Sequence, residues 1–427
     1  MGLLSKNSLL RLEHIFTVFS LLFFTEGVFR LVLTGGANQG DGAKYDASLV
    51  QLISICIYAI TFALLCMRWK KVLMYVSRDR WILPLILFAI ASMIWSDAPA
   101  LTFRRSFALV GTSLFGVYLA TRYTIRQQVA LLGWMFGIAI LLSVLFIIIP
   151  PQYGISGGVH SGAWRGIWSH KNGLAQKMAI AANVFLILSL STRQKRWLPC
   201  VLLSMAVLLE VMARSTAGLL AMAITMMILP LVQAFRWRSR FMIPAVIGII
   251  SASSLILISL FYGAETVLAF FGEDTSLTGR ADFWPIVIDK IQEQPLLGYG
   301  YEAFWRGFEG PSADIAYATM TGFIPTHAHN GILQLWLHLG FIGVFLFLVG
   351  LWTTILKSIT FIRVSDSFEG LWPLLYCSLV ILFNLSESVI LEYNQIVWVI
   401  YIAVSLSVLR LPERSEPHTD QSSSLSA

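Results

Sequence analysis

Two histidines separated by one residue stand just before a long apolar segment. They lie in residues 325–330 (PTHAHN), where His327 and His329 are followed by Asn330. Two imidazoles at this spacing could ligate a metal ion, but no further histidine, cysteine or carboxylate stands at a recognisable ligand spacing. Because histidine titrates near neutral pH, the pair favours a general base that takes a proton from an attacking hydroxyl group. We therefore expect no metal and no cofactor here.

A second polar cluster lies in residues 164–173 (WRGIWSHKNG), which carry Arg165, His170, Lys171 and Asn172. The cluster stands beside glycines at the start of an expected helix. A helix N-terminus offers unpaired N–H groups and partial positive charge, so Arg165, Lys171 and backbone donors could hold a phosphate together. The alternative is that the tryptophans and cations only anchor this loop at the lipid headgroups.

Arg214 stands in a tight turn between two apolar segments, within residues 210–218 (EVMARSTAG). An arginine beside two hydroxyl groups at a helix start is a second candidate anion site. Glu210, four residues earlier, could orient Arg214. The alternative is an intrahelical Glu–Arg pair whose charged end reaches the membrane interface.

A third arginine lies in residues 277–284 (LTGRADFW), where Thr278 could cap a helix whose first turn carries Arg280 and Asp282, followed by Trp284. A cation in a first turn opposes the helix dipole, so a nearby anion would rationalise it. That anion could be a ligand, or only Asp282 or Asp289.

The composition places these clusters in a membrane protein. Hydrophobic residues make up 57% of the 427 and charged residues 12%, and the mean hydropathy is +0.75. These values exclude an ordinary soluble domain. The four cysteines all lie in apolar runs, which favours free buried thiols over disulfides.

Apolar stretches of the length needed to cross a bilayer predict an all-α polytopic fold of about twelve transmembrane helices. They start near Ile15, Leu49, Trp81, Phe107, Val129, Gly173, Trp197, Ala217, Phe241, Gly331, Trp372 and Ile396. Two connections are long. Residues 150–172 form one, and residues 263–330 form the other, which is predicted to be partly helical between Asp282 and Gln292 and ordered by its aromatic residues.

The distribution of Lys and Arg predicts that both termini are cytoplasmic. With that orientation, nineteen of the 30 basic residues fall on inside segments and ten on outside segments. The net charge of +7 therefore reports topology and not nucleic-acid binding. We expect an integral domain at residues 1–411 and a disordered cytoplasmic tail at 412–427. Glu26 and Arg30, one helical turn apart, are expected to pair inside the bundle.

This topology brings all four polar clusters to the outer face, although they are far apart in the sequence. Together they supply arginines for a diphosphate and an imidazole for a hydroxyl group. These groups suit the displacement of a pyrophosphate leaving group from a lipid-bound sugar, with arginines in place of a divalent ion.

At these residues the sequence resembles the superfamily of O-antigen polymerases and O-antigen ligases, and within it the exopolysaccharide-polymerase branch. The resemblance covers about residues 164–343. His329-Asn330, then nine residues, then Gly340 and Gly343 is similar to the whole histidine motif of the family. Arg280 with Trp284 is similar to its arginine motif, and the Arg214 turn to its other arginine element. Residues 170–172 (HKN) favour the exopolysaccharide branch.

The resemblance implies a metal-independent, inverting glycosyltransferase with a periplasmic active site in the bacterial inner membrane. The donor would be a glycan on undecaprenyl diphosphate, bound by Arg214 and Arg280, and His329 would activate the acceptor hydroxyl. The acceptor would be another lipid-linked repeat unit in a polymerase, and lipid A–core or a protein in a ligase. Predicted substrate-binding residues are Arg165, His170, Lys171, Asn172, Asp282, Trp284, His327 and Asn330. Membrane lipids, a flippase and a chain-length regulator are the expected partners.

Two other classes of function remain open. A transporter or flippase commonly has twelve spans with both termini inside, but few ionisable residues fall near the expected midplanes apart from Glu26 and Arg30, and no pair of interrupted helices is evident. A non-catalytic assembly subunit is not excluded by any residue.

Overall fold

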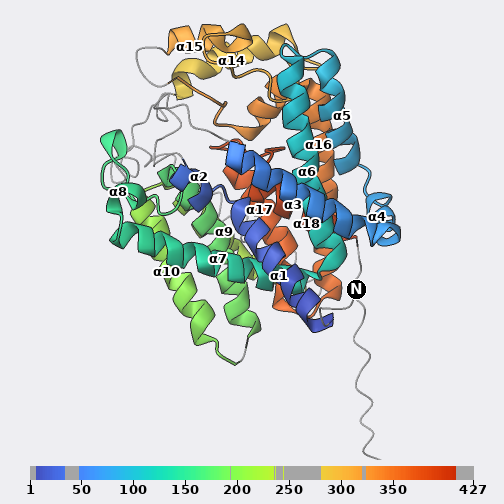
Figure 1. Cartoon of the computed structure of the whole chain (residues 1–427), viewed down its shortest axis with the longest axis vertical. Helices are drawn as coiled ribbons and strands as arrows, with labels where there is room; N and C mark the ends of the chain where they lie inside the picture. The colour runs from blue at the N-terminus through green and yellow to red at the C-terminus, as the bar shows by residue number, and fades with distance from the viewer. Residues whose placement is uncertain are drawn as a thin grey trace, which may run out of the picture.

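The structure is a computed structural model, and it describes residues 6–33, 48–192, 194–234, 236, 244, 280–319 and 324–409. Within these residues the fold is helical, and the β-structure is a single isolated bridge between Ile155 and Trp164 (Figure 1). The α-helices are α1 (Lys6–Phe23), α2 (Val28–Leu33), α3 (Ser48–Cys66), α4 (Trp69–Val76), α5 (Ile82–Ala91), α6 (Pro99–Arg122), α7 (Ile125–Ile148), α8 (Pro151–Gly154), α9 (Lys171–Ser191), α10 (Trp197–Ala213), α11 (Thr216–Ala234), α14 (Arg280–Glu293), α15 (Ala313–Ala318), α16 (Gly331–Val364), α17 (Trp372–Phe383) and α18 (Ile396–Ser407). Short 3₁₀ turns are η1 (Ser92–Ile94), η2 (Gly158–His160), η3 (Gly310–Ser312) and η4 (Phe368–Leu371).

Four of the described helices, α3, α7, α9 and α16, are long and apolar enough to cross a bilayer. Five shorter apolar segments accompany them, including α17 and α18. A helix occurs at every predicted span except the one expected near Phe241, which lies outside the described residues. The prediction of a helical membrane protein is therefore confirmed.

Helices α9 and α18 form the centre of the bundle. Every residue of α18 is buried, and it packs on α6. Helix α9 is mostly buried among α7, α10, α11 and α17. Small residues such as Ala175, Ala179 and Ala182 let neighbouring helices approach α9 closely. By contrast, α3 exposes large apolar side chains such as Leu52 and Phe62, as expected for a helix that faces lipid.

Contacts group the helix connections into two ends of the bundle. At one end, called here the histidine end, Trp168 Nε1 donates to the Thr25 carbonyl at 2.9 Å, and Asn172 Nδ2 donates to Glu387 at 2.9 Å. At the other end, called the Glu13 end, Glu13 pairs with Arg68 at 2.7 Å and Arg122 at 3.0 Å. The Asn172–Glu387 contact therefore joins two connections that were predicted to lie on the same side of the membrane.

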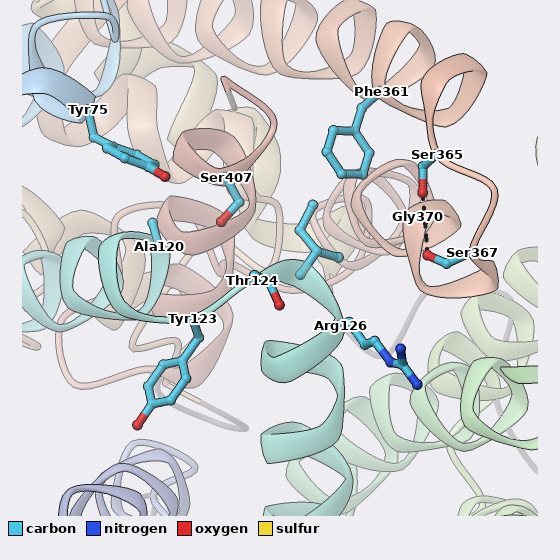
Figure 2. Close-up of a pocket in the computed structure, with 11 residues that line it drawn as sticks. Tyr75, Ala120, Tyr123, Thr124, Arg126, Phe361, Ser365, Ser367, Gly370 and Ser407 are labelled. Atoms are coloured by element: carbon cyan, nitrogen blue, oxygen red, sulfur yellow. Dashed lines mark hydrogen bonds between the residues drawn. The ribbon is translucent and has the colours of Figure 1, made fainter. Parts of the chain in front are cut away.

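A cavity of about 250 Å³ opens at the Glu13 end (Figure 2). Its lining combines hydroxyl side chains with a single charged residue, Arg126, whose guanidinium lies 3.5 Å from Glu369. None of the predicted site residues lines this cavity. It is therefore separate from the polar clusters that the sequence singled out.

The part of the long connection at 280–319 folds as a unit with its own hydrophobic cluster. Phe283, Tyr299 and Phe304 are buried together against Leu337 of α16. The expected helix from Asp282 to Gln292 is found as α14. Helices α14 and α15 lie across one end of the molecule (Figure 1). The prediction that aromatic residues order this connection is confirmed for its described part.

This unit docks onto a break in α16 at Gly340, where the backbone has φ 62° and ψ −167°. The break leaves the carbonyls of Leu337 and His338 free, and the N–H groups of Tyr299 and Gly300 donate to them at 2.8 and 3.0 Å. A β-carbon on Gly340 would lie 2.2 Å from backbone atoms of Leu296. Only glycine therefore fits at this position.

Several expectations concern residues outside this description. They include the tail at 412–427, residues 263–279 of the long connection with Thr278, and the side chains of Arg30, Arg280 and Asp282. Glu26, the expected partner of Arg30, accepts a hydrogen bond from Gln395 at 2.7 Å. All four cysteines are free thiols, as predicted, but the expectation that all of them are buried is wrong. Cys377 is buried, whereas Cys56, Cys66 and Cys200 lie in apolar helical segments with their side chains exposed.

Candidate functional site

The turn that carries His327 and His329 is held on both sides of Ala328. Trp284 Nε1 donates to the Ala328 carbonyl at 2.9 Å, and the Ala328 N–H donates to Gln334 Oε1 at 2.9 Å. The His329 backbone is left-handed, with φ 51°, which a residue with a β-carbon adopts only when its surroundings impose it. Trp284 thus reaches the histidine turn from α14 and positions it through its indole, and its predicted contact with substrate stays a prediction.

Asn330 closes the same turn as the N-cap of α16. Its side-chain oxygen accepts from the N–H groups of Ile332 and Leu333 at 3.0 and 3.1 Å. These bonds satisfy two of the four unpaired donors at a helix start. The capping contact accounts for Asn330 beside the histidines, and its contact with substrate stays a prediction.

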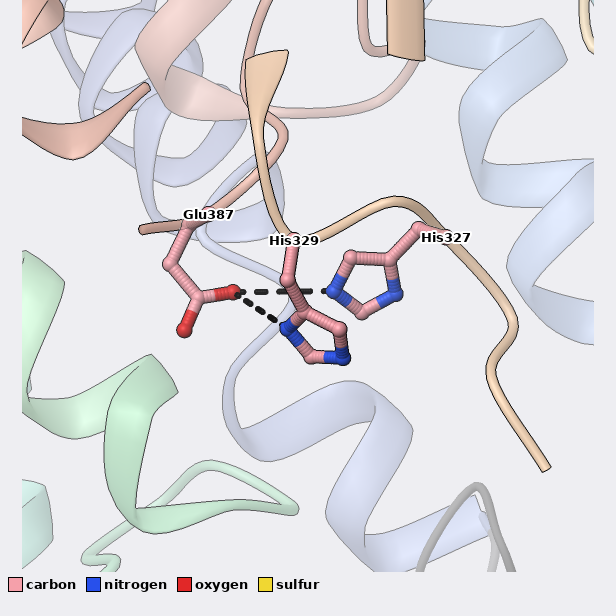
Figure 3. A group of neighbouring side chains, drawn as sticks. All are labelled: His327, His329 and Glu387. Atoms are coloured by element: carbon pink, nitrogen blue, oxygen red, sulfur yellow. Dashed lines mark ion pairs between the residues drawn. The ribbon is translucent and has the colours of Figure 1, made fainter. Parts of the chain in front are cut away.

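Glu387, in the connection between α17 and α18, faces both histidines (Figure 3). Its Oε2 lies 3.6 Å from His327 Nε2 and 3.8 Å from His329 Nδ1. Its Oε1 accepts a hydrogen bond from Asn172 at 2.9 Å. We call His327, His329 and Glu387 the histidine cluster. Through Glu387, two sequence motifs more than 150 residues apart meet at one place.

Sequence analysis missed Glu387, because no local pattern links it to the histidines. A signal was present, since residues 384–395 form a polar break between two apolar segments and carry Glu387 and Glu392. The predicted topology puts that break on the same side as the histidines. A carboxylate there was therefore a candidate neighbour, although its pairing needs the three-dimensional structure.

His170 is the N-cap of α9, and its Nδ1 accepts from the Asn172 N–H at 3.2 Å. An acceptor nitrogen must be unprotonated. Desolvation by the surrounding protein, with a smaller contribution from His160, lowers the pKa of His170 to about 4, which agrees with a neutral ring. The His160 and His170 rings meet edge-on, with centroids 5.3 Å apart. His170 therefore acts as a cap and keeps Asn172 turned toward Glu387.

Lys171 connects the start of α9 to the Arg214 turn. Its Nζ donates to the Arg214 carbonyl at 3.0 Å, and the Trp164 N–H donates to the Met212 carbonyl at 2.9 Å. Arg214 has a left-handed backbone with φ 51°, and its side chain is exposed. Two of the predicted anion-binding clusters are therefore in contact through Lys171 and the backbone of the Arg214 turn.

The side chains of Arg165 and Glu210 are buried, whereas that of Arg214 is exposed. Arg165 is buried, and its guanidinium donates to the carbonyls of Tyr153, Gln152 and Ser169 at 3.0 to 3.3 Å. These bonds organise the loop before α9, and a contact of Arg165 with substrate stays a prediction. Glu210 is fully buried, and no Glu210–Arg214 pair occurs among the described residues. The expected orienting role of Glu210 is therefore wrong.

A chain of polar side chains continues from the histidine turn into the bundle. Gln334 Nε2 lies 3.1 Å from His338 Nε2, and His338 Nδ1 lies 3.7 Å from Glu302. Glu302 in turn lies 3.4 Å from Arg105 of α6. Sequence analysis did not single out these residues, because no local motif links them to one another. Their contacts tie the histidine turn to α6 and to the docked unit.

Most of the predicted site residues thus meet at the histidine end. His327, His329 and Asn330 share one turn, which Trp284 contacts from α14. Lys171 and Asn172 join this turn to the backbone of Arg214 through Glu387. Arg280 begins α14, one helical turn before Trp284. The structure leaves the side chains of Arg280 and Asp282 undescribed, so their roles stay predictions.

Comparison with known proteins adds an independent observation. Residues 198–348 match the model of the O-antigen ligase family, and this stretch includes Arg214, Arg280, His329 and Gly340. The exopolysaccharide production protein ExoQ of Rhizobium meliloti (strain 1021) is 24% identical over 315 residues, which cover 71% of this chain and 70% of that protein.

Two shorter matches are to proteins named as polysaccharide ligases. The one from Rickettsia conorii is 39% identical over 80 residues, or 18% of this chain and 20% of that protein. The one from Rickettsia prowazekii is 36% identical over 98 residues, or 23% of this chain and 24% of that protein. Together with the motifs gathered at the histidine end, these matches support the resemblance of the chain to the superfamily of O-antigen ligases and polymerases and to its exopolysaccharide branch.

Proposed function

We propose that this protein polymerises oligosaccharide repeat units carried on undecaprenyl diphosphate, at the periplasmic face of the bacterial inner membrane. The observation that supports this most is the meeting of His329 with Asn172 through Glu387, next to the Lys171–Arg214 contact. A base for a hydroxyl group and cations for a diphosphate are thereby supplied by neighbouring segments. Glycosyl transfer from a diphosphate needs both.

In the proposed reaction, the acceptor hydroxyl oxygen attacks the anomeric carbon of the donor sugar. The bond from that carbon to the diphosphate oxygen breaks, so the configuration inverts and undecaprenyl diphosphate leaves. His329 takes the hydroxyl proton, and Glu387 faces the other side of its ring and stabilises the imidazolium. Arg214 and Arg280 balance the charge that develops on the diphosphate, so no divalent ion is required.

The proposed topology has about twelve spans with both termini in the cytoplasm. In this topology the histidine end faces the periplasm and the Glu13 end faces the cytoplasm. The clustering of connections into two ends supports the alternation of spans. We propose residues 1–411 as the integral domain and residues 412–427 as a disordered cytoplasmic tail.

The acceptor decides between a polymerase and a ligase. The relative with the longest match is named an exopolysaccharide production protein, which favours a growing polymer as the product. The two rickettsial relatives are named polysaccharide ligases, which favours transfer to lipid A–core or a protein as the second candidate. A flippase and a chain-length regulator are the proposed partners of the polymerase. A transporter function has no comparable support at the histidine end.

Replacement of His329 tests the enzymatic proposal. In the His329→Ala variant, long polymer should disappear and lipid-linked single repeats should accumulate, because the base is lost. A general base contributes about 10²- to 10⁴-fold to a rate. Product sizing after reconstitution with a defined lipid-linked oligosaccharide measures this effect, and the acceptor that is used separates a polymerase from a ligase.

His14→Ala is the matched control, because His14 is an exposed histidine on α1. It should leave chain length unchanged. If His329→Ala inserts normally into the membrane and still makes polysaccharide of normal length, the catalytic assignment of His329 is wrong. Turnover in excess chelator should equal turnover without it.

A further inference from the structure

The histidine cluster has the composition of a metal-ion site. Two imidazole nitrogens and one carboxylate oxygen all lie within 4.8 Å of one another. Two histidines and a glutamate are also the ligand set of one common class of zinc site, which keeps a fourth position open. The sequence did not predict this set, because its third member stands 58 residues after His329.

The distances fit an ion better than they fit direct hydrogen bonds. Oε2 of Glu387 lies 3.6 and 3.8 Å from the two imidazole nitrogens, which is beyond hydrogen-bond length. Ligand atoms around a tetrahedral zinc ion are about 3.3 Å apart, given bonds of about 2.0 to 2.1 Å. Small side-chain rotations would therefore bring all three atoms to a shared ion.

The surroundings of the cluster supply the supporting contacts that a metal site needs. Ligand histidines and carboxylates usually bond a second group with their other polar atom. Oε1 of Glu387 accepts from Asn172, and Nδ1 of His327 lies 3.3 Å from the Thr326 hydroxyl. The three side chains remain 17 to 31% exposed, so an ion can reach them from solvent.

We propose that His327, His329 and Glu387 bind one divalent transition-metal ion of the zinc type. The ligands are His327 Nε2, His329 Nδ1 and Glu387 Oε2. Imidazole and carboxylate ligands in this number suit zinc or cobalt, whereas magnesium prefers oxygen ligands and retains its waters. Since the ion fixes the His329 ring and neutralises the carboxylate that supports it, occupancy inhibits glycan transfer. The inhibition of glycan transfer rests on the proposed function, whereas the binding of the ion does not.

Cobalt serves as the probe for binding. The purified full-length protein in detergent is stripped with chelator and titrated with Co²⁺, whose visible absorption reports its coordination. We expect one Co²⁺ per chain, displaced by Zn²⁺ and not by Mg²⁺. His327→Ala and Glu387→Ala should each weaken binding by at least about tenfold, since even outer-shell changes at metal sites cost about 10- to 100-fold.

Asn172→Ala provides a variant that keeps all three ligands and removes only the bond to Glu387. It should weaken Co²⁺ binding by about tenfold. His14→Ala is the control, because His14 is exposed on α1 and lies outside the cluster. Failure of the wild-type protein to bind Co²⁺, equal binding by the ligand variants, or loss of binding in His14→Ala would overturn the site.

The transfer assay separates this inference from the proposed function. Stoichiometric Zn²⁺ should inhibit the wild-type protein, and chelator should restore turnover. Binding of Co²⁺ without inhibition by Zn²⁺ would overturn the inhibitory role. Loss of turnover in chelator would instead refute the metal-independent mechanism. Because the absorption titration needs no glycan, it reports on the site even if the protein transfers nothing.

Discussion

Arg214 and His329, which bind the diphosphate and take the hydroxyl proton in the proposed reaction, both have a left-handed backbone with φ 51°. This conformation costs about 1–3 kcal/mol for a residue with a β-carbon. The surrounding contacts hold it in place. The Arg214 carbonyl accepts from Lys171, and Ala328 beside His329 is bonded on both sides. The backbone at both positions is therefore held in place by its neighbours.

Arg280 tests the diphosphate assignment at the scale of a single side chain. Arg280→Lys should lower turnover by about 10- to 100-fold, because a lysine cannot form the paired hydrogen bonds that a guanidinium gives a phosphate. The matched control is Lys290→Arg on the same helix, whose ammonium pairs with Glu293 and Asp314. The turnover of both variants is measured in the transfer assay with purified protein. Unchanged turnover in Arg280→Lys would count against diphosphate binding there.

The sequence predicted which residues gather at the site better than it predicted what each side chain contacts. Asn172 and His327 were expected near substrate, and they do meet at Glu387. Arg165 was expected to bind an anion, yet its described bonds go to backbone carbonyls. The sequence around an arginine does not show whether its guanidinium bonds to loop carbonyls or to a phosphate, because both offer oxygen acceptors. The path of the folded loop determines which acceptors lie within reach.

At the scale of the elements, α16 joins the histidine turn to the docked unit. The sequence predicted a span from Gly331 but not the break at Gly340, although it singled out Gly340 and Gly343 as part of a motif. The structure explains why a glycine stands at position 340, because the break there leaves two carbonyls of α16 free to accept from the N–H groups of Tyr299 and Gly300. Hydropathy cannot reveal such a break, since it reports apolar content and not backbone conformation.

Gly340→Ala tests this docking. Alanine cannot adopt the backbone of Gly340 without strain, and its β-carbon would overlap Leu296. We expect a loss of about 1–3 kcal/mol in stability or more, and reduced transfer, because Trp284 reaches the histidine turn from the docked unit. Thermal unfolding in detergent measures the first effect.

The matched control is Gly137→Ala in α7, where a β-carbon would meet only Leu202 at an ordinary 3.7 Å. It should leave both stability and transfer near the wild-type values, because alanine suits a helix interior better than glycine does. Equal behaviour of the two variants would contradict the role given to Gly340.

At the scale of the whole molecule, simple physical patterns predicted the helical membrane fold and the grouping of the polar clusters. Apolar length predicted the helices, and the expected alternation of spans agrees with the contact between Asn172 and Glu387. The sequence did not predict which helices pack against one another. Packing of α9 against α10 and α11 depends on the fit of small residues such as Ala175 and Gly218, which hydropathy does not distinguish.

The orientation of the bundle is open to a direct test by thiol labelling. In a background without the four native cysteines, Ser161→Cys would mark the histidine end, and Ser77→Cys would mark the connection after α4, predicted to be cytoplasmic. Both positions are exposed in the structure. A membrane-impermeant reagent should label Ser161→Cys in spheroplasts, and Ser77→Cys only after the membrane is broken. The excess of Lys and Arg on the predicted cytoplasmic segments requires this result. The opposite pattern would place His329 and Glu387 in the cytoplasm, where a polymerase of exported repeat units could not use them.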